Sequence, residues 1–249
     1  ALADARVVYV TGPRQAGKTT IARQVAAALG AEYQTLDDRT VREFALAEPE
    51  EFLERDGLLV VDEVQRGGDD LLLALKARVD RDTTPGQYLL TGSTRFLTVP
   101  TMSESLAGRV ELVDLWPLAQ SEIERKHVGL VDGLFGSTRS VRNASLPPVS
   151  RAEVFERVCR GGFPEPVGRS SRSRGRWFDA YARTLTGRDV GELANIQRVQ
   201  DLPALVRLLA ARTATAINLS SLAADAGIPR TTLAGYMPLL EDVFLMFRL

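Results

Sequence analysis

A segment near the N-terminus combines the residue types that bind phosphate groups. Gly12, Gly17, Lys18 and Thr19 occupy every fixed position of the pattern G-x-x-x-x-G-K-[ST]. In such a loop, backbone N–H groups converge on an anion, and the helix that follows adds the positive end of its dipole. Lys18 is expected to neutralise the β- and γ-phosphates of ATP, and Thr19 to ligate Mg²⁺. The residues expected to bind the nucleotide are Gly12, Pro13, Arg14, Gln15, Ala16, Gly17, Lys18, Thr19 and Thr20.

Two carboxylates follow the apolar run at residues 58–61, which has the composition of a buried strand. Asp62 is expected to bind the nucleotide's Mg²⁺ through the water shell of the ion. Glu63 can polarise the water that attacks the γ-phosphate, so it is the candidate catalytic base, and its presence favours hydrolysis over binding alone. The alternative for Asp62 and Glu63 is that they are solvated residues at the end of a strand. The alternative for the segment from Gly12 to Thr19 is a glycine turn with a solvated lysine.

Small hydroxyl side chains end another apolar run, at residues 87–91. In P-loop enzymes with a separate catalytic glutamate, the strand between the two phosphate-site strands ends in a polar residue that senses the γ-phosphate or orients water. Ser93 is the first candidate for this role and Thr91 the second. The alternative is that these hydroxyls only close a turn beside Gly92.

Arginines near these runs could stabilise the charge of a transition state. Arg109 immediately precedes the apolar run at 110–115, and its planar, permanently charged group suits an arginine finger acting within its own subunit or on a neighbour. Arg95 competes for this role. A surface arginine in an ion pair is the alternative.

Positioning these residues requires strands that alternate with helices. Hydrophobic periodicity predicts strands at 6–11, 33–36, 58–61, 87–91 and 110–115, and helices at 19–29, 40–55 with a break at Pro49, and 71–79. This alternation predicts an α/β fold, a three-layer P-loop sandwich with a mostly parallel sheet. The candidate residues follow strands, where open α/β sheets bind ligands.

The character of the sequence changes after Trp116 and Pro117. We expect a P-loop core at 1–126, a linker or mobile loop at 127–150, a helical lid at 151–212 and a truncated winged-helix-like segment at 213–249. The Ser/Arg-rich stretch 169–176 is expected to interrupt the helices, and the apolar run 243–249 resembles a strand.

Two segments could contact DNA. Residues 218–236 have the order of a helix-turn-helix, with Arg230, Thr231 and Thr232 at the start of the second helix. Earlier in the chain, four arginines lie within eight residues and two aromatic residues follow them: Arg169, Arg172, Arg174, Arg176, Trp177 and Phe178. The alternatives are a packing module without DNA and a solvated loop. His127 and Cys159 are expected to be structural.

Overall composition limits the classes of partner. The chain of 249 residues has 31 Lys and Arg against 32 Asp and Glu, so its formal charge of -1 gives no global attraction to nucleic acid or anionic membranes. The single cysteine excludes an internal disulfide framework. Because there is neither a long apolar run nor a recognisable signal peptide, we expect a cytoplasmic protein without membrane contact.

The combined motifs resemble AAA+ ATPases, specifically a bacterial and archaeal group whose C-terminal domain is of unknown function. The segments that carry the resemblance are Gly12-Pro-Arg-Gln-Ala-Gly-Lys-Thr-Thr20, Val61-Asp-Glu-Val-Gln-Arg66, Leu90-Thr-Gly-Ser93, Ser105-Leu-Ala-Gly-Arg109, Trp116-Pro-Leu-Ala119, Gly161-Gly-Phe-Pro164 and Arg188-Asp-Val190. The resemblance implies an ATPase core, a helical lid, a winged-helix-like segment and a further C-terminal domain that this sequence lacks. It also implies that the chain could form a homo-oligomeric ring. Arg66-Gly-Gly-Asp-Asp70 replaces the proline-containing turn usual in this group.

The leading hypothesis is therefore Mg²⁺-dependent ATP hydrolysis that moves a helical and winged-helix region. The alternative is a DNA-binding switch controlled by ATP or ADP occupancy with negligible hydrolysis. A small-molecule kinase is less favoured, because the Asp62-Glu63 pair suits water better than an alcohol and no substrate pocket is legible.

Overall fold

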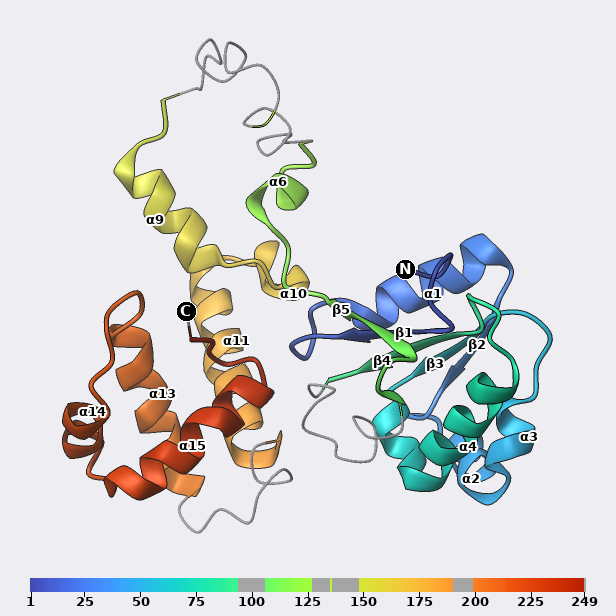
Figure 1. Ribbon diagram of the computed structural model, residues 1–249. Coiled ribbons are helices and arrows are strands. Elements are labelled where there is room, and N and C mark those ends of the chain that lie inside the picture. The colour runs from blue at the N-terminus through green and yellow to red at the C-terminus, as the bar shows by residue number, and fades with distance from the viewer. Residues whose placement is uncertain (94–105, 127–134, 136–147, 190–198, 249) are drawn as a thin grey trace. The chain divides into compact units, whose positions relative to one another are not determined.

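The computed structural model describes residues 1–93, 106–126, 135, 148–189 and 199–248 (Figure 1). They divide into two compact units, one made of residues 1–116 and 180–249 and the other of residues 117–179. The first boundary coincides with the change in composition after Trp116. The division differs from the expected segments, because residues 117–126 belong to the second unit and residues 180–249 to the unit that contains the core.

The described residues of the core form a five-stranded sheet in the order β2-β3-β4-β1-β5, and every neighbouring pair is parallel. The strands are β1 (Val7–Thr11), β2 (Glu32–Thr35), β3 (Leu59–Asp62), β4 (Tyr88–Gly92) and β5 (Val110–Asp114). Each begins and ends within a residue or two of its predicted position. The predicted α/β class with a parallel sheet is therefore confirmed.

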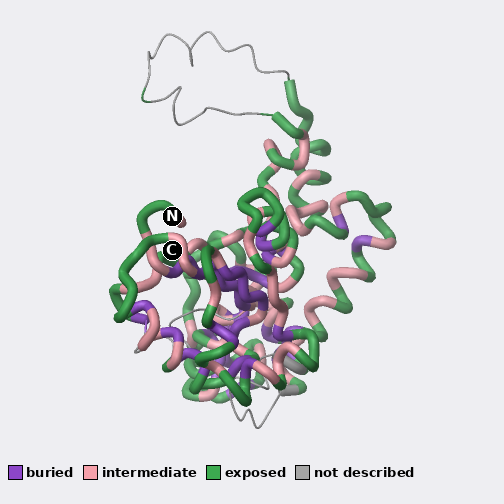
Figure 2. The backbone as a smooth tube through the Cα atoms, turned by 90° about the vertical axis from the view of Figure 1, so that its right-hand side faces the viewer, coloured by how far each residue is buried: buried purple, intermediate pink, exposed green. Residues whose placement is uncertain are grey.

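Helices cover both faces of this sheet. Val7 and Tyr9 of β1 pack with the helices α2 (Arg39–Ala47), α3 (Pro49–Leu53) and α4 (Gly68–Arg81). Val8 and Val10, which point the other way, pack with α1 (Lys18–Leu29). Figure 2 shows buried residues concentrated in the central strands. The core therefore has the three layers expected of a P-loop sandwich, and its strands read as continuous apolar runs because both faces are covered.

Local sequence signals explain where these helices begin and end. The Asp38 side chain caps α2 by accepting hydrogen bonds from the N–H groups of Thr40 and Val41. Gly30 ends α1 in the left-handed conformation, and Pro49 occupies the first turn of α3. The predicted break at Pro49 is thus the junction between two helices.

The second unit contains α6 (Gln120–Ile123), α9 (Arg151–Arg160), α10 (Pro164–Val167) and the first part of α11 (Ser171–Thr184). The expectation that residues 169–176 interrupt the helices is wrong from Ser171 onward. Arg174 is buried in α11 and forms an ion pair with Glu156 of α9 at 3.0 Å. This contact joins α11 to α9, and composition alone does not predict it.

The C-terminal part of the first unit is helical. After α11 it contains η3 (Leu185–Asp189), η4 (Val199–Asp201), α13 (Leu202–Ala211), α14 (Leu219–Ala226) and α15 (Arg230–Asp242). Gly227 is left-handed between α14 and α15, so the helix-turn-helix order is present. Residues 243–248 form no strand, contrary to the strand-like reading of 243–249, because Val243, Leu245 and Met246 pack against the helices instead.

Candidate functional site

The phosphate-binding pattern occupies the connection between β1 and α1. Gly12 has a φ of 151°, and a Cβ atom at this position would overlap the backbone carbonyl of Leu115. The Leu115 N–H also donates to the carbonyl of Thr11 at 2.7 Å. Gly12 is thus required where the loop passes directly against the chain that leaves β5.

Lys18 begins α1 and is buried. Its Nζ donates to the backbone carbonyls of Gly12 and Pro13, both at 2.9 Å. Burial removes solvation from the ammonium group and lowers its pKa to about 8, although the nearby carboxylates of Glu63 and Asp62 oppose this shift. The loop therefore encloses a cation whose direct partners are neutral carbonyl groups.

Asp62 is the buried last residue of β3, and hydroxyl groups surround its carboxylate. Thr19 donates to Oδ2 at 3.0 Å, Tyr33 donates to the same oxygen at 2.9 Å, and Thr91 donates to Oδ1. The structure thus brings together the two residues predicted to hold Mg²⁺, Thr19 and Asp62. Hydroxyl and carboxylate oxygens are the donors that Mg²⁺ prefers.

Thr91, the second candidate for the polar residue of β4, is fully buried and joins the two acidic residues. Its hydroxyl oxygen accepts a hydrogen bond from the Glu63 N–H at 3.2 Å and donates to Asp62. β4 lies between β1 and β3, which confirms that these hydroxyls end the strand between the two phosphate-site strands. Thr91 therefore helps to define where β3 presents its carboxylates.

Glu63 has a left-handed backbone, with φ 58° and ψ 45°. This conformation costs a residue with a side chain on the order of 1 kcal/mol or more, so the surrounding structure must impose it. The Glu63 carboxylate accepts a hydrogen bond from Nε2 of Gln65, and the same nitrogen lies 3.4 Å from Oγ of Ser93. The candidate base and the first candidate sensor are thus joined through one amide.

The rest of the predicted loop surrounds Lys18. Pro13 and Ala16 are buried, whereas Gln15 and Thr20 are exposed. The carbonyl of Arg14 accepts a hydrogen bond at 3.0 Å from the hydroxyl of Tyr181 on α11, which belongs to the same compact unit.

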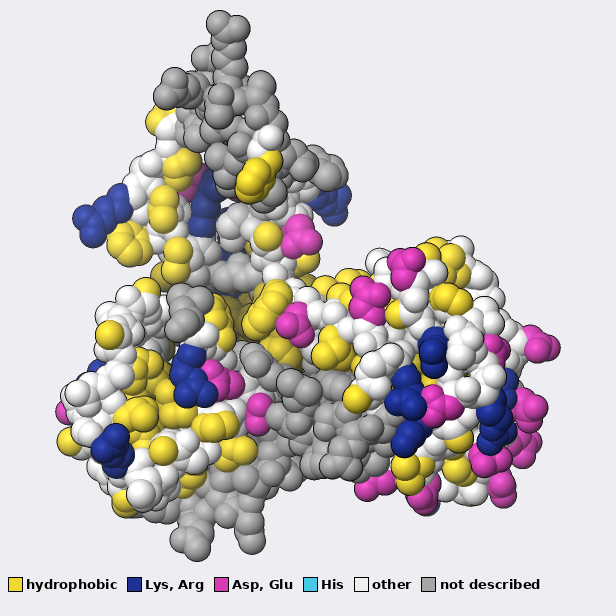
Figure 3. Space-filling view, in the orientation of Figure 1, with side chains coloured by type: hydrophobic (Ala, Val, Ile, Leu, Met, Phe, Trp, Pro, Cys, Tyr) yellow, Lys and Arg dark blue, Asp and Glu magenta, His cyan; other side chains and the backbone are white. Residues whose placement is uncertain are grey.

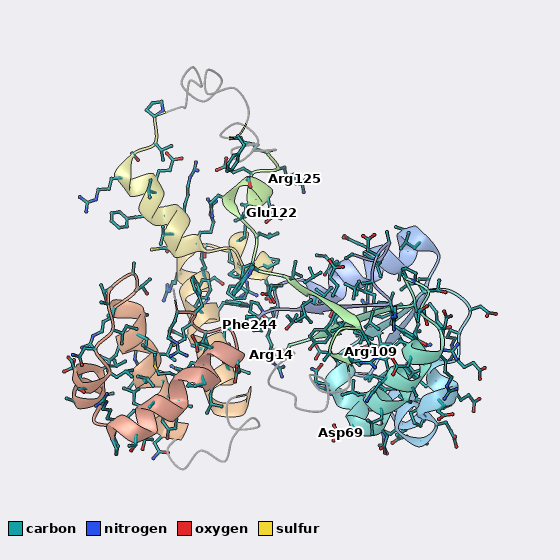
Figure 4. All side chains as sticks on the ribbon, in the orientation of Figure 1. Arg14, Asp69, Arg109, Glu122, Arg125 and Phe244 are labelled. Atoms are coloured by element: carbon teal, nitrogen blue, oxygen red, sulfur yellow. The ribbon has the colours of Figure 1, made fainter. Side chains whose placement is uncertain are left out.

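The structure does not bring Arg109 to this site within the chain. Arg109 directly precedes β5, whose first residue pairs with the first residue of β1, so it lies at the amino edge of the sheet. There it forms a two-pronged ion pair with Asp80 of α4, whose Nη2–Oδ2 distance is 2.9 Å. Figure 4 labels Arg109 together with Arg14 of the phosphate loop. Arg95 lies outside the described residues.

Sequence reasoning missed Tyr33. The residue lies in β2 beside Val60 of β3, and its ring is 5.2 Å from the guanidinium carbon of Arg23 on α1. Burial raises the pKa of the Tyr33 hydroxyl, and a hydrogen bond with Tyr33 raises the pKa of Arg23. The aromatic residue in a short strand was visible in the sequence, but its contact with Asp62 depends on the order of strands.

Several of the residues predicted to contact DNA have partners within the protein. Arg169 pairs with Glu165, and Trp177 and Phe178 pack around Phe163 with ring-centre distances of 5.6 and 6.2 Å. The aromatic pair is thus part of a cluster within the second unit. Figure 3 shows acidic and basic side chains intermingled on the visible face of the core.

At the start of α15, Arg230 and Thr231 are exposed and Thr232 is partly buried. Cys159 is exposed on α9, and His127 lies outside the described residues. Across the part of the chain that the structure describes, no helix has both the length and the apolarity needed to cross a membrane.

A family model described as "AAA domain" matches residues 4–124, and a model described as a domain of unknown function matches residues 151–249. Uncharacterised proteins of Mycobacterium bovis and Mycobacterium tuberculosis are each 32% identical over the whole chain. The chain spans about half the length of these curated relatives, 51% in each case.

Among solved structures, a Walker-type ATPase of Pyrococcus abyssi has a TM-score of 0.51 at 17% identity, covering 96% of this chain and 85% of that protein. A RuvB variant of Thermotoga maritima has a TM-score of 0.43 at 20% identity, covering 98% and 82%. The first likeness shows the fold alone. Residues 4–124 therefore match the AAA domain family, and residues 151–249 match a family whose function is unassigned.

Proposed function

We propose that this chain binds ATP together with Mg²⁺ and hydrolyses the γ-phosphate bond. The observation that carries the proposal is the arrangement at the carboxyl edge of the sheet. A buried lysine with neutral partners lies in a glycine-bounded loop, and the Thr19 hydroxyl and Asp62 carboxylate lie 3.0 Å apart beside it. A triphosphate with its metal offers the negative charge and the oxygen-ligated ion that these residues fit.

Each residue has a defined part in this proposal. Lys18 and the loop N–H groups bind the phosphates, while Thr19 and Asp62 hold Mg²⁺, which when bound neutralises charge that develops on the phosphate oxygens. Glu63 accepts a proton from the attacking water. Its position next to Asp62 supports this role, because it places a second carboxylate beside the phosphate site.

We further propose that nucleotide state moves the helical region. The Tyr181 hydroxyl contacts the Arg14 carbonyl in the phosphate loop, and α11 continues from this contact into the second unit. A loop that changes conformation on binding phosphate would change this hydrogen bond. The contact supports coupling between nucleotide occupancy and the helices.

Replacing Glu63 with Gln tests the catalytic assignment. We expect phosphate release to fall by at least about a hundredfold, because general bases contribute 10²–10⁴-fold, while the affinity for a fluorescent ATP analogue stays at the parental value. Glu50→Gln, an exposed glutamate on α3, is the matched control and should retain the parental rate. Turnover by Glu63→Gln at the parental rate would remove Glu63 from the mechanism.

A nucleotide-controlled DNA switch is the second candidate, favoured by the order of α14, Gly227 and α15 with Arg230 exposed at the start of the second helix. The test measures duplex DNA affinity with ATP, with ADP and without nucleotide, using the Glu63→Gln variant to hold the ATP state. Equal affinity in the three states would remove the switch. Arg230→Ala should weaken binding if this helix contacts the duplex.

Homo-oligomerisation is also part of the proposal, since the resemblance implies rings with shared active sites. The ATPase rate per molecule, measured against protein concentration, tests it. A rate per molecule that rises with concentration would support a site completed by a second copy, and a constant rate would contradict it.

A further inference from the structure

Gln65 occupies the turn that follows the candidate base. It lies in the 3₁₀ turn η1 (Val64–Gly67), immediately after the left-handed Glu63. Because the backbone reverses at Glu63, the side chain two residues later returns to the carboxylate. Nε2 of Gln65 donates to Oε2 of Glu63 and lies 3.4 Å from Oγ of Ser93.

The surroundings of Gln65 determine how its amide is oriented. Oε1 of Gln65 is buried and has no hydrogen-bond partner among the described residues. Turning the amide over would place this oxygen against the Glu63 carboxylate, where two acceptors would repel each other. The contacts of Nε2 with Glu63 and Ser93 therefore decide the orientation, at the cost of leaving one acceptor unpaired.

The end of β4 is shaped to admit this amide. A Cβ atom added to Gly92 would lie 2.9 Å from Oε1 of Gln65 and would overlap the hydroxyl of Tyr9. Gly92 lies between Thr91 and Ser93. The Thr91 hydroxyl is hydrogen-bonded to the Asp62 carboxylate and the Glu63 N–H, and Oγ of Ser93 is within hydrogen-bond distance of the Gln65 amide. The backbone and the carboxylate of Glu63 are thus both held by the same strand end, through different side chains.

We infer that Gln65 is a positioning residue that couples Ser93 to the orientation of the Glu63 carboxylate. This inference rests on the proposed ATPase function and deepens it. A phosphate that engages the Ser93 hydroxyl changes a hydrogen-bond partner of the Gln65 amide, and the same amide orients Glu63. Gln65 acts through Glu63 and does not itself contact the substrate.

The first measurement is the steady-state kinetics of Gln65→Ala. Loss of one hydrogen bond to a charged group should lower kcat by about tenfold while leaving the affinity for a fluorescent ATP analogue unchanged. Gln65→Glu keeps the size of the side chain but replaces the donor with an acceptor, so it should lower kcat at least as much. A role in packing alone would leave Gln65→Glu near the parental kcat.

The chain contains a matched control. Gln34 also follows a glutamate by two residues, and its Nε2 donates to Oε1 of Glu32 at 2.7 Å on an exposed part of β2. Gln34→Ala removes the same kind of amide–carboxylate bond away from the candidate site. We expect its kcat and thermal midpoint to match those of the parent.

The decisive measurement is a double-mutant cycle between Gln65→Ala and Ser93→Ala, read in kcat. If Gln65 links the two residues, the loss caused by Ser93→Ala is several-fold smaller when Gln65 is already absent. Independent, multiplying losses, or a parental kcat for Gln65→Ala, would overturn the inference. Thermal midpoints of each variant verify that the compared proteins are folded.

The outcomes separate this inference from the function on which it rests. A parent protein that does not hydrolyse ATP would overturn both. A parent that hydrolyses ATP, loses turnover on Glu63→Gln and keeps it on Gln65→Ala would leave the ATPase assignment in place and remove only the role of Gln65.

Discussion

Charged side chains at the carboxyl edge and the amino edge of the central sheet differ in their burial and in their direct partners. At the carboxyl edge, Lys18 is 5% exposed and Asp62 2% exposed, and their direct partners are neutral carbonyl and hydroxyl groups. At the amino edge, the Arg109 and Asp80 side chains pair with each other and remain 27% and 40% exposed. Each holds the pKa of the other away from its usual value through their hydrogen bonds, lowering that of Asp80 and raising that of Arg109.

This difference indicates which edge accepts a ligand. Burying a charge that makes no direct ion pair costs free energy, which an incoming ligand of opposite charge can offset. The ion pair at the amino edge is already complete and open to water, so it gains little from a further partner. If this contrast holds, substitutions at the carboxyl edge should change nucleotide binding or stability, whereas breaking the ion pair at the amino edge should change little.

Replacing Lys18 with Ala should have the largest effect. Removing the buried ammonium from a triphosphate site should weaken ATP binding by about 30-fold or more, as for other buried, hydrogen-bonded charges. Titration with a fluorescent ATP analogue measures the change, and Lys76→Ala on α4 serves as the control. Parental affinity in Lys18→Ala would place the nucleotide elsewhere.

Replacing Thr91 with Val should destabilise the protein without changing the shape of this side chain. The substitution deprives Oδ1 of Asp62 of its donor and the Glu63 N–H of its acceptor. We expect the free energy of unfolding, measured in urea without nucleotide, to fall by about 1–3 kcal/mol. Thr91→Ser keeps the hydroxyl and should lose much less, and equal losses would contradict the bridging role.

The lowered pKa of Lys18 makes nucleotide affinity depend on pH. Without nucleotide this group loses its proton as pH rises through about 8. ATP binds the charged form and therefore raises the pKa of Lys18, so this group should add no pH dependence to the affinity well below pH 8. Above that pH the affinity should fall by up to about tenfold for each further unit. Lys18→Arg stays charged throughout, and its affinity should not change across this range. The same pH profile in both proteins would exclude Lys18 as the cause.

Replacing Arg109 with Ala should have the smallest effect within one chain. Exposed ion pairs contribute little to stability, so the thermal midpoint should stay within the scatter of the measurement. The ATPase rate at low protein concentration should also be unchanged. A loss confined to concentrations at which the rate per molecule rises would instead assign Arg109 to a neighbouring subunit's site.

The sequence predicts the parts of the site whose positions depend on the spacing of neighbouring residues along the chain. The pattern from Gly12 to Thr19 lies between a strand and a helix as required, and the apolar run before Asp62 is β3. Continuous apolar composition sufficed to find the strands because both faces of the sheet are covered. The parallel direction of the strands also means that a residue just before β5, such as Arg109, lies opposite the site.

The parts that could not be predicted depend on contacts between distant segments. Tyr33 reaches Asp62 only because β2 lies beside β3, and strand order is not encoded in periodicity. Gln65 reaches Glu63 because Glu63 has a left-handed backbone, for which a glutamate gives no local signal. Similarly, the Ser/Arg-rich composition gives no local signal that Arg174 of the helix at Ser171–Thr184 is buried beside Glu156 of α9.

The close passage of Gly12 against Leu115 has a mechanical consequence. Leu115 is followed by Trp116, and the second compact unit starts at Pro117. The end of the segment that leaves β5 thus contacts the phosphate loop through backbone atoms, and Gly12 places no Cβ between them. A ligand that changes the backbone at Gly12 would therefore meet the Leu115 carbonyl directly, two residues before the second unit begins.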